Sequence, residues 1–149
     1  MTASVLVIGT GNALRRDDGA GLEAAREVRR AGIEVREAYG DLSGLADLWA
    51  GRQRVIVVDA VRTGAVVGTV HRLDAVAKPL PAIFSRRSTH AIGIAEAVEL
   101  VRALGRLPRS LVVYGIEGSD FAQGEGLTPE VARATKEAAD RIVQEARHA

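Results

Sequence analysis

Residues 54–61, RVIVVDAV, decide the fold of this 149-residue chain. Positions 55–58 are four consecutive β-branched residues, and such a continuous apolar run is typical of a strand that is covered on both faces. Asp59 follows at the carboxyl end of this run. Burying an unpaired carboxylate costs several kcal/mol, roughly, so the residue needs a partner. The stretch therefore predicts a central strand that ends in a functional or carefully paired acid.

Two further apolar runs flank this one, residues 4–9 (SVLVIG) and 110–116 (SLVVYGI). We expect residues 5–8, 55–58 and 111–114 to be neighbouring or near-neighbouring buried parallel strands. Residues 33–39 alternate apolar and charged side chains as an edge strand does, and TVHRLD (69–74) reads as a hairpin-like excursion.

Helical patterns separate the strands, over residues 19–32, 91–104 and from Pro129 onward. Ser43 is the expected N-cap of a short helix, Ser88 or Thr89 that of the helix over 91–104, and Thr128 that of the last helix. This alternation predicts an α/β fold, a three-layer sandwich in which a twisted, mostly parallel, doubly wound sheet has helices on both faces. The length predicts one domain, residues 1–149.

Composition excludes several classes of protein. The chain has no cysteine, so any metal site must use His, Asp or Glu. The net charge is +1 and aromatic residues are 3%, which argues against nucleic acid as a partner. No apolar run approaches the ~20 residues of a membrane span or forms a secretory signal. We therefore expect a cytoplasmic protein with no membrane partner, acting as a monomer.

Three polar side chains fall where strands give way to helices or loops: Asp18, Asp59 and His90. In doubly wound sheets, ligands bind outside the carboxyl ends of the strands, so we expect these groups to converge at one edge. Two carboxylates and an imidazole form a three-ligand site with open positions, suitable for Ni, Zn, Mn or Fe. The adjacent Asp17 has a simpler interpretation as the N-cap of the following helix.

Competing chemistries lack their motifs. The glycine-rich turn GTGNALRRDDGAG resembles a dinucleotide fingerprint, but the third glycine is replaced by Leu14. Neither of the two lysines, Lys78 and Lys136, follows a phosphate-binding loop. No serine occupies a G-x-S-x-G elbow, and neither candidate aspartate lies in a D-T/S-G loop. Metal-linked chemistry remains the best interpretation.

Four blocks in order resemble the hydrogenase maturation proteases, the endopeptidases that trim the large subunit of [NiFe] hydrogenases. The blocks are VIGTGNALRRDDGAG (7–21), VIVVDAV (55–61), STHAIGIAEAVELVRALGRLP (88–108), and VYGIEG (113–118) with GEGLTPEV (124–131). The resemblance implies that Asp18, Asp59 and His90 are the nickel-recognising residues. The first of these positions is often Glu in the family.

The resemblance further implies that the partner is a [NiFe]-hydrogenase large-subunit precursor, whose C-terminal extension is removed after nickel insertion. The metal then belongs to the substrate, and we expect no resident cofactor. Two alternative functions stay open: a hydrolase that keeps its own Zn or Mn at the same three residues, and a non-catalytic metal- or nucleotide-binding module built on this fold.

Overall fold

The computed structural model describes residues 4–84 and 92–148, and within them the chain forms a five-stranded sheet in the order β2-β1-β3-β5-β4. The three central strands are β1 (Val5–Gly11), β3 (Arg54–Val61) and β5 (Ser110–Glu117), and they are mutually parallel. The edges are β2 (Val35–Tyr39), parallel to β1, and β4 (Val70–Asp74), antiparallel to β5. The predicted order of buried parallel strands is confirmed.

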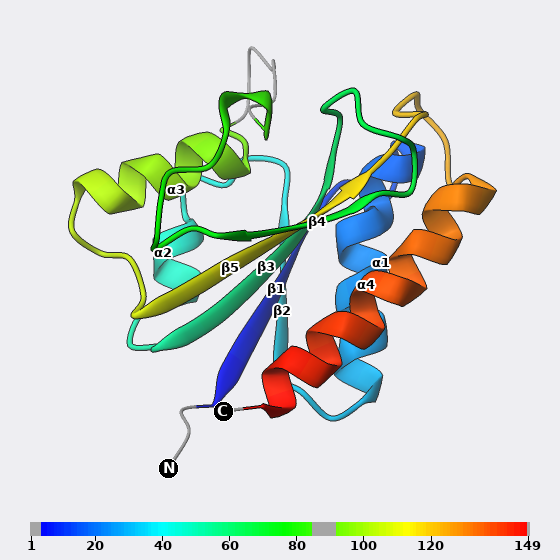
Figure 1. Cartoon of the computed structure of the whole chain (residues 1–149). Coiled ribbons are helices and arrows are strands. Elements are labelled where there is room, and N and C mark those ends of the chain that lie inside the picture. Colours follow the sequence, from blue (N-terminus) through cyan, green and yellow to red (C-terminus); the bar gives the residue numbers. More distant parts are fainter. Residues whose placement is uncertain (1–3, 85–91, 149) are drawn as a thin grey trace.

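Helices cover both faces of this sheet (Figure 1). On one side lie α1 (Ala20–Arg30) and α4 (Pro129–Arg147), and on the other lie α2 (Leu45–Leu48) and α3 (Ile94–Ala103). Successive side chains of a strand point to opposite faces, so Val57 packs into the core beneath α2 and α3 while Val58 packs into the core beneath α1 and α4. This double coverage explains why the central strands are apolar at almost every position, and it confirms the predicted fold class.

Several boundaries differ from the expectation. Helix α3 begins at Ile94 after Gly93, whose backbone is extended, so the predicted capping by Ser88 or Thr89 is wrong. Helix α2 has Gly44 as its N-cap instead of Ser43, because the Ser43 amide donates to the Asp41 carboxylate in the preceding turn. In both cases a glycine directly precedes the helix and is its N-cap.

The excursion after β3 is also more than a hairpin. Its strand, β4, pairs with β5 instead of with the preceding strand β3, and Ala75 extends the pairing by donating its amide to the Leu111 carbonyl. Two short 3-10 turns complete the described elements, η1 (Arg16–Gly19) and η2 (Ala82–Phe84).

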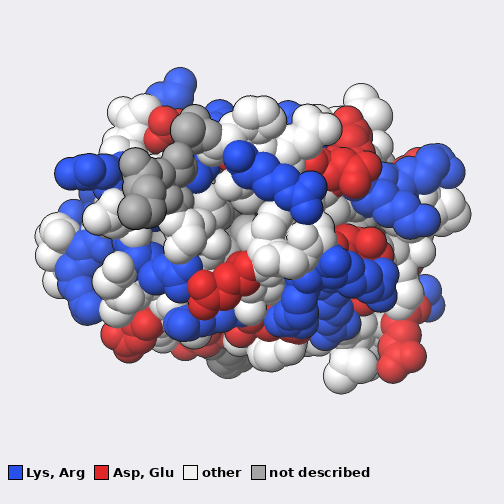
Figure 2. Space-filling view, turned by 90° about the horizontal axis from the view of Figure 1, so that it is seen from below, with Lys and Arg blue, Asp and Glu red and all other residues white. Residues whose placement is uncertain are grey.

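The two ends of the sheet differ in what surrounds them. The amino end, at the bottom of Figure 1 and facing the viewer in Figure 2, carries basic and acidic side chains interspersed. At the opposite, carboxyl end lie the turn that contains Asp17 and Asp18 and the last residues of β3, which include Asp59. Among the described residues, no helix is both long enough and apolar enough to cross a membrane.

Candidate functional site

Asp18 and Asp59 come together at the carboxyl end of β1. Both are buried, with 5% and 2% of their surface exposed. Gly11, the last residue of β1, lies beside both: a Cβ placed on it would be 2.1 Å from the Asp18 carbonyl oxygen and 3.9 Å from Asp59 Oδ1. The backbone of Asp18 and the side chain of Asp59, 41 positions apart in sequence, thus both lie beside Gly11 at one edge of the sheet.

Close backbone contact holds this edge together. A Cβ on Gly21, in the first turn of α1, would lie 2.4 Å from the Val58 carbonyl oxygen, 2.5 Å from the Thr10 carbonyl oxygen and 2.8 Å from Asp59 Cα. Only glycine allows the helix to approach the ends of β1 and β3 so closely. In this chain Gly21 of the glycine-rich turn therefore allows α1 to pack directly against β3, the strand that carries Asp59.

The Asp59 carboxylate contacts the backbone of the residue that follows it in β3. Its Oδ1 accepts a hydrogen bond from the Ala60 amide at 2.9 Å. One residue earlier in β3, the Val58 carbonyl accepts a hydrogen bond from the Thr10 hydroxyl of β1 at 3.4 Å. The carboxylate is therefore oriented by the backbone that follows it.

The third predicted residue, His90, lies outside the described residues. Within residues 4–84 and 92–148, no group of three or more His, Asp or Glu side chains is arranged to hold a metal ion. The structure thus places the two predicted aspartates at the same edge of the sheet, while their convergence with His90 on one metal ion stays a prediction.

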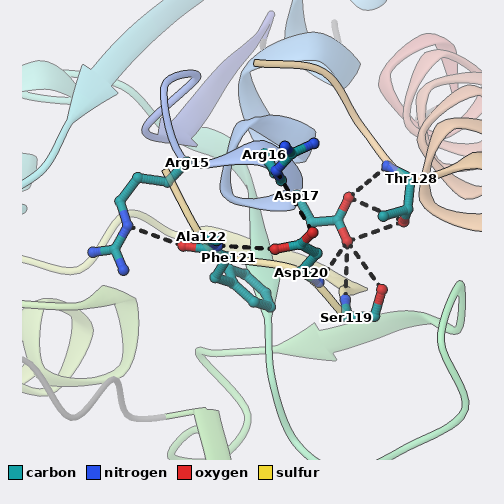
Figure 3. Close-up of polar contacts among 8 residues, drawn as sticks. All are labelled: Arg15, Arg16, Asp17, Ser119, Asp120, Phe121, Ala122 and Thr128. Carbon is teal, nitrogen blue, oxygen red and sulfur yellow. Dashed lines mark hydrogen bonds and ion pairs between the residues drawn. The ribbon is translucent and has the colours of Figure 1, made fainter. Parts of the chain in front are cut away.

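Asp17 has a role that the sequence did not reveal. It does not cap α1, whose N-cap is Gly19 with no side-chain capping bond, so that prediction is wrong. Asp17 lies inside η1, one turn too early to reach the free amides of the helix, and its side chain points instead toward the loop of residues 118–128 (Figure 3). We call this segment the 118–128 loop.

The Asp17 carboxylate is fully buried and is surrounded by donors from that loop. The Thr128 amide donates to Oδ1 at 2.8 Å, and the Ser119 and Asp120 amides donate to Oδ2 at 3.0 Å each. The hydroxyls of Ser119 and Thr128 add contacts at 3.0–3.3 Å. Burial opposes ionisation, but the amides of Asp120, Ser119 and Thr128 outweigh it and lower the pKa of Asp17.

Main-chain hydrogen bonds reinforce the same junction. The Arg16 amide donates to the Gly124 carbonyl at 3.0 Å, the Gly124 amide donates to the Leu14 carbonyl at 2.9 Å, and the Asp17 amide donates to the Asp120 carbonyl at 2.9 Å. Arg16 has a φ of +46°, the left-handed conformation that side chains seldom adopt. The turn is therefore held in a costly shape by its contacts with the 118–128 loop.

A second buried acid at the same edge also escaped the sequence analysis. Glu117 ends β5, and its carboxylate accepts hydrogen bonds from the Thr63 amide at 2.7 Å and the Thr63 hydroxyl at 2.5 Å. His71 Nε2 of β4 lies 3.1 Å from Glu117 Oε1. An acid that follows a buried strand was the available signal, as it was for Asp59. The Phe84 ring packs edge-on against His71 and lies over Gly115, beside the contacts between Glu117, Thr63 and His71. We interpret these contacts as structural, because they hold β4 against β5.

A cavity of about 300 Å³ opens on the outer side of the turn that carries Asp18, between η1 and the beginning of α4. Ala13, Leu127 and Ala132 contribute its apolar wall, and Arg16 and Glu23 its charged rim. Neither Asp18 nor Asp59 lines it. The cavity is thus a neighbour of the candidate site and separate from it.

Comparison with known proteins agrees with this arrangement. The model of the hydrogenase maturation protease family HycI matches residues 42–145. Protein FrxA of Pyrococcus furiosus is 30% identical over 131 residues, covering 85% of this chain and 93% of the relative. The hydrogenase 2 maturation protease of Escherichia coli is 26% identical over 153 residues, covering 93% and 88% of the two chains.

Solved structures share the fold as well. The hydrogenase maturating endopeptidase HybD from E. coli superposes with a TM-score of 0.79 at 25% identity, covering 97% of this chain and 92% of that one. A five-stranded α/β sheet with two acids at its carboxyl edge is thus the scaffold of a peptidase. The chain belongs to the hydrogenase maturation protease family.

Proposed function

We propose that this protein is an endopeptidase that removes the C-terminal extension of a [NiFe]-hydrogenase large-subunit precursor once nickel has been inserted. Family membership supports the activity and the kind of substrate. The observation that supports the site assignment is that Asp18 and Asp59 are both buried beside Gly11 at the carboxyl end of the sheet, where the backbone of Asp18 and the carboxylate of Asp59 flank this glycine. Carboxylates there provide the hard, anionic ligands that a divalent metal binds.

In this proposal Asp18, Asp59 and His90 bind the nickel that the precursor brings. The nickel places the adjacent peptide for attack and assists hydrolysis, either by polarising the carbonyl or by activating water. Water adds across the peptide bond: the carbonyl carbon gains the hydroxyl and the leaving amine gains the proton. Without nickel, the three side chains have no shared cation to bind, so an empty precursor is held weakly and processing waits for metal insertion.

The test is to incubate the purified chain with nickel-loaded and nickel-free precursor and to follow loss of the C-terminal peptide by gel and mass spectrometry. Cleavage of the loaded form alone is expected. Cleavage of both forms would contradict nickel-dependent recognition. Stoichiometric Zn or Mn in the chain as purified would favour instead a hydrolase with a resident metal.

Substitutions test the residue assignment. Asp18→Ala, Asp59→Asn and His90→Ala should each lower kcat/KM by more than about 100-fold, because losing a metal ligand exceeds the roughly 10–100-fold effect of altering a residue that only orients one. Asp47→Asn is the matched control, since Asp47 lies on α2 with 85% of its side chain exposed. Normal processing by the three site variants, each folded by circular dichroism, would refute the assignment.

A further inference from the structure

The carboxylate of Asp17 makes contacts that only an ionised acid can make. Every group that meets its two oxygens is a donor: the amides of Ser119, Asp120 and Thr128, and the hydroxyls of Ser119 and Thr128. Asparagine has the same shape, but its NH₂ group would face N–H donors, and these would lose their acceptor. The position of Asp17 therefore requires a negatively charged side chain, although both of its oxygens contact only the protein.

These donors come from a distant part of the sequence. The hydrogen bonds that the Asp17 carboxylate accepts span 102 to 111 positions, and all of their donors lie in the 118–128 loop. Thr128 is the N-cap residue of α4, yet its hydroxyl contacts Asp17 and makes no capping bond to its own helix. The amino end of α4 is thus hydrogen-bonded to the turn that carries Asp18, the candidate metal ligand.

The next residue along that turn is Asp18, and its placement depends on the same contacts. The Asp18 amide donates to the Arg15 carbonyl at 3.0 Å, and the Asp18 carbonyl accepts from the Asn12 amide at 3.2 Å. These bonds lie within the turn, whereas the bonds from Leu14, Arg16 and Asp17 anchor the turn to the 118–128 loop. Releasing the anchor would let Asp18 move with the turn, away from Asp59.

From this geometry we infer that Asp17 is a positioning residue for the peptidase site, which fixes the turn against the 118–128 loop so that Asp18 meets the substrate metal in a set orientation. The inference rests on the role proposed above for Asp18. Asp17 itself does not contact the metal, because both of its oxygens are engaged by donors of the loop.

The experiment compares Asp17→Asn with a matched control, Glu145→Gln. Glu145 is also an acid that accepts several hydrogen bonds, from Arg72 and Tyr114, but it lies near the carboxyl end of α4, at the opposite end of this helix from Thr128. For both variants we would measure the melting temperature, hydrogen exchange of the Asn12 and Asp18 amides, and kcat and KM for nickel-loaded precursor at a temperature where each is fully folded.

We expect Asp17→Asn to accelerate exchange of these amides and to lower kcat/KM by roughly 10–100-fold, as for other residues that orient a metal ligand. Glu145→Gln should lower the melting temperature. It should leave the exchange of both amides and kcat/KM within about twofold of the wild-type values, because mutations at distant sites act independently. Thr128→Val, which removes a hydroxyl donor from the far side of the junction, should act in the same direction as Asp17→Asn with a smaller effect.

Two results would overturn the inference: unchanged exchange at Asn12 and Asp18 in Asp17→Asn, or normal kcat/KM in that folded variant while Asp18→Ala is inactive. Failure of the proposed function gives a different pattern, because Asp18→Ala would then process the precursor normally. Unchanged kcat/KM in Thr128→Val together with an inactive Asp17→Asn would also contradict positioning and point to direct contact between Asp17 and the substrate.

Discussion

At the scale of single residues, Gly21 determines how closely α1 approaches the site. The atoms that a side chain would meet are the Val58 and Thr10 carbonyl oxygens and the Cα of Asp59, all of them backbone and unable to rotate away. A methyl group here would separate the helix from the strand ends that it covers. The effect would therefore reach Asp59, which stands at one of these ends.

We accordingly expect Gly21→Ala to destabilise the protein by about 2–3 kcal/mol, in the range of overpacked cores, despite the better helix propensity of alanine. Urea unfolding followed by circular dichroism measures this. Gly44→Ala is the control, because a Cβ on Gly44 meets nothing within 4 Å and its φ is −89°. Equal stabilities of the two variants would show that the helix can shift without cost.

The candidate site was predictable from sequence only in part. Asp59 was identifiable because an acid directly after a buried strand must have a partner, and Asp18 because it lies at the turn after another such strand. Asp17 was misassigned, since its partners lie more than 100 positions away and leave no local pattern. Capping rules describe neighbours in sequence, and they could not detect an acid whose role is to join two distant loops.

At the scale of elements, α4 is attached to the sheet by polar contacts near its carboxyl end. Arg72 of β4 donates two hydrogen bonds to Glu145, at 2.9 and 2.7 Å, and the Tyr114 hydroxyl donates to the same carboxylate. Hydrogen bonding to Arg72 lowers the pKa of Glu145 against the opposing effect of burial. The same environment, mainly burial and then Glu145, raises the pKa of Tyr114 to about 12.

The Glu145 contacts predict a pH-dependent contribution to stability. A lowered pKa in the folded state means that the contribution is complete above the ordinary value of 4.5 and is lost as the pH falls through the folded value. Glu145→Gln should therefore cost about 1–2 kcal/mol at pH 7, less than a fully buried charged network because Arg72 is partly exposed. The difference from wild type, measured by urea unfolding, should shrink steadily below pH 4.5. A constant difference down to pH 3 would contradict this account.

Element types were easier to predict than element boundaries. Apolar periodicity located the central strands and the long helices because it reflects the faces that each buries. The starts of α2 and α3 were misplaced, since Gly44 and Gly93 are the N-caps of these helices, and before α2 the Ser43 amide is used in a turn with Asp41. Predicting that β4 pairs with β5 would have required knowing that β5 has an unpaired edge in the sheet. No local sequence pattern carries that information.

At the scale of the whole molecule, the three central strands contribute to both cores. The core on the α2 and α3 side contains Trp49, the single tryptophan, and the core on the other side lies beneath α1 and α4, which hold most of the described helical residues. Neither core can lose its packing without exposing one face of the strands whose opposite face forms the other core.

We therefore predict cooperative unfolding of the two layers. Tryptophan fluorescence reports the α2 and α3 side, whereas far-ultraviolet circular dichroism reports mainly α1 and α4. The two signals should give the same urea midpoint and the same dependence on denaturant, as in two-state unfolding. Midpoints that differ by more than the experimental error would show that one helical layer can leave the sheet on its own.

The link from Asp17 to Thr128 also sets the order of events as the protein is made. At roughly 5–20 residues per second, a ribosome needs about 6–20 s to add the 111 positions between them. During this interval Asp18 and Asp59 have both been synthesised, but the turn that carries Asp18 has no anchor. A nascent chain therefore holds the two acids before the contacts that fix the turn can form, and we expect the proposed site to be complete only when the beginning of α4 has emerged and docked.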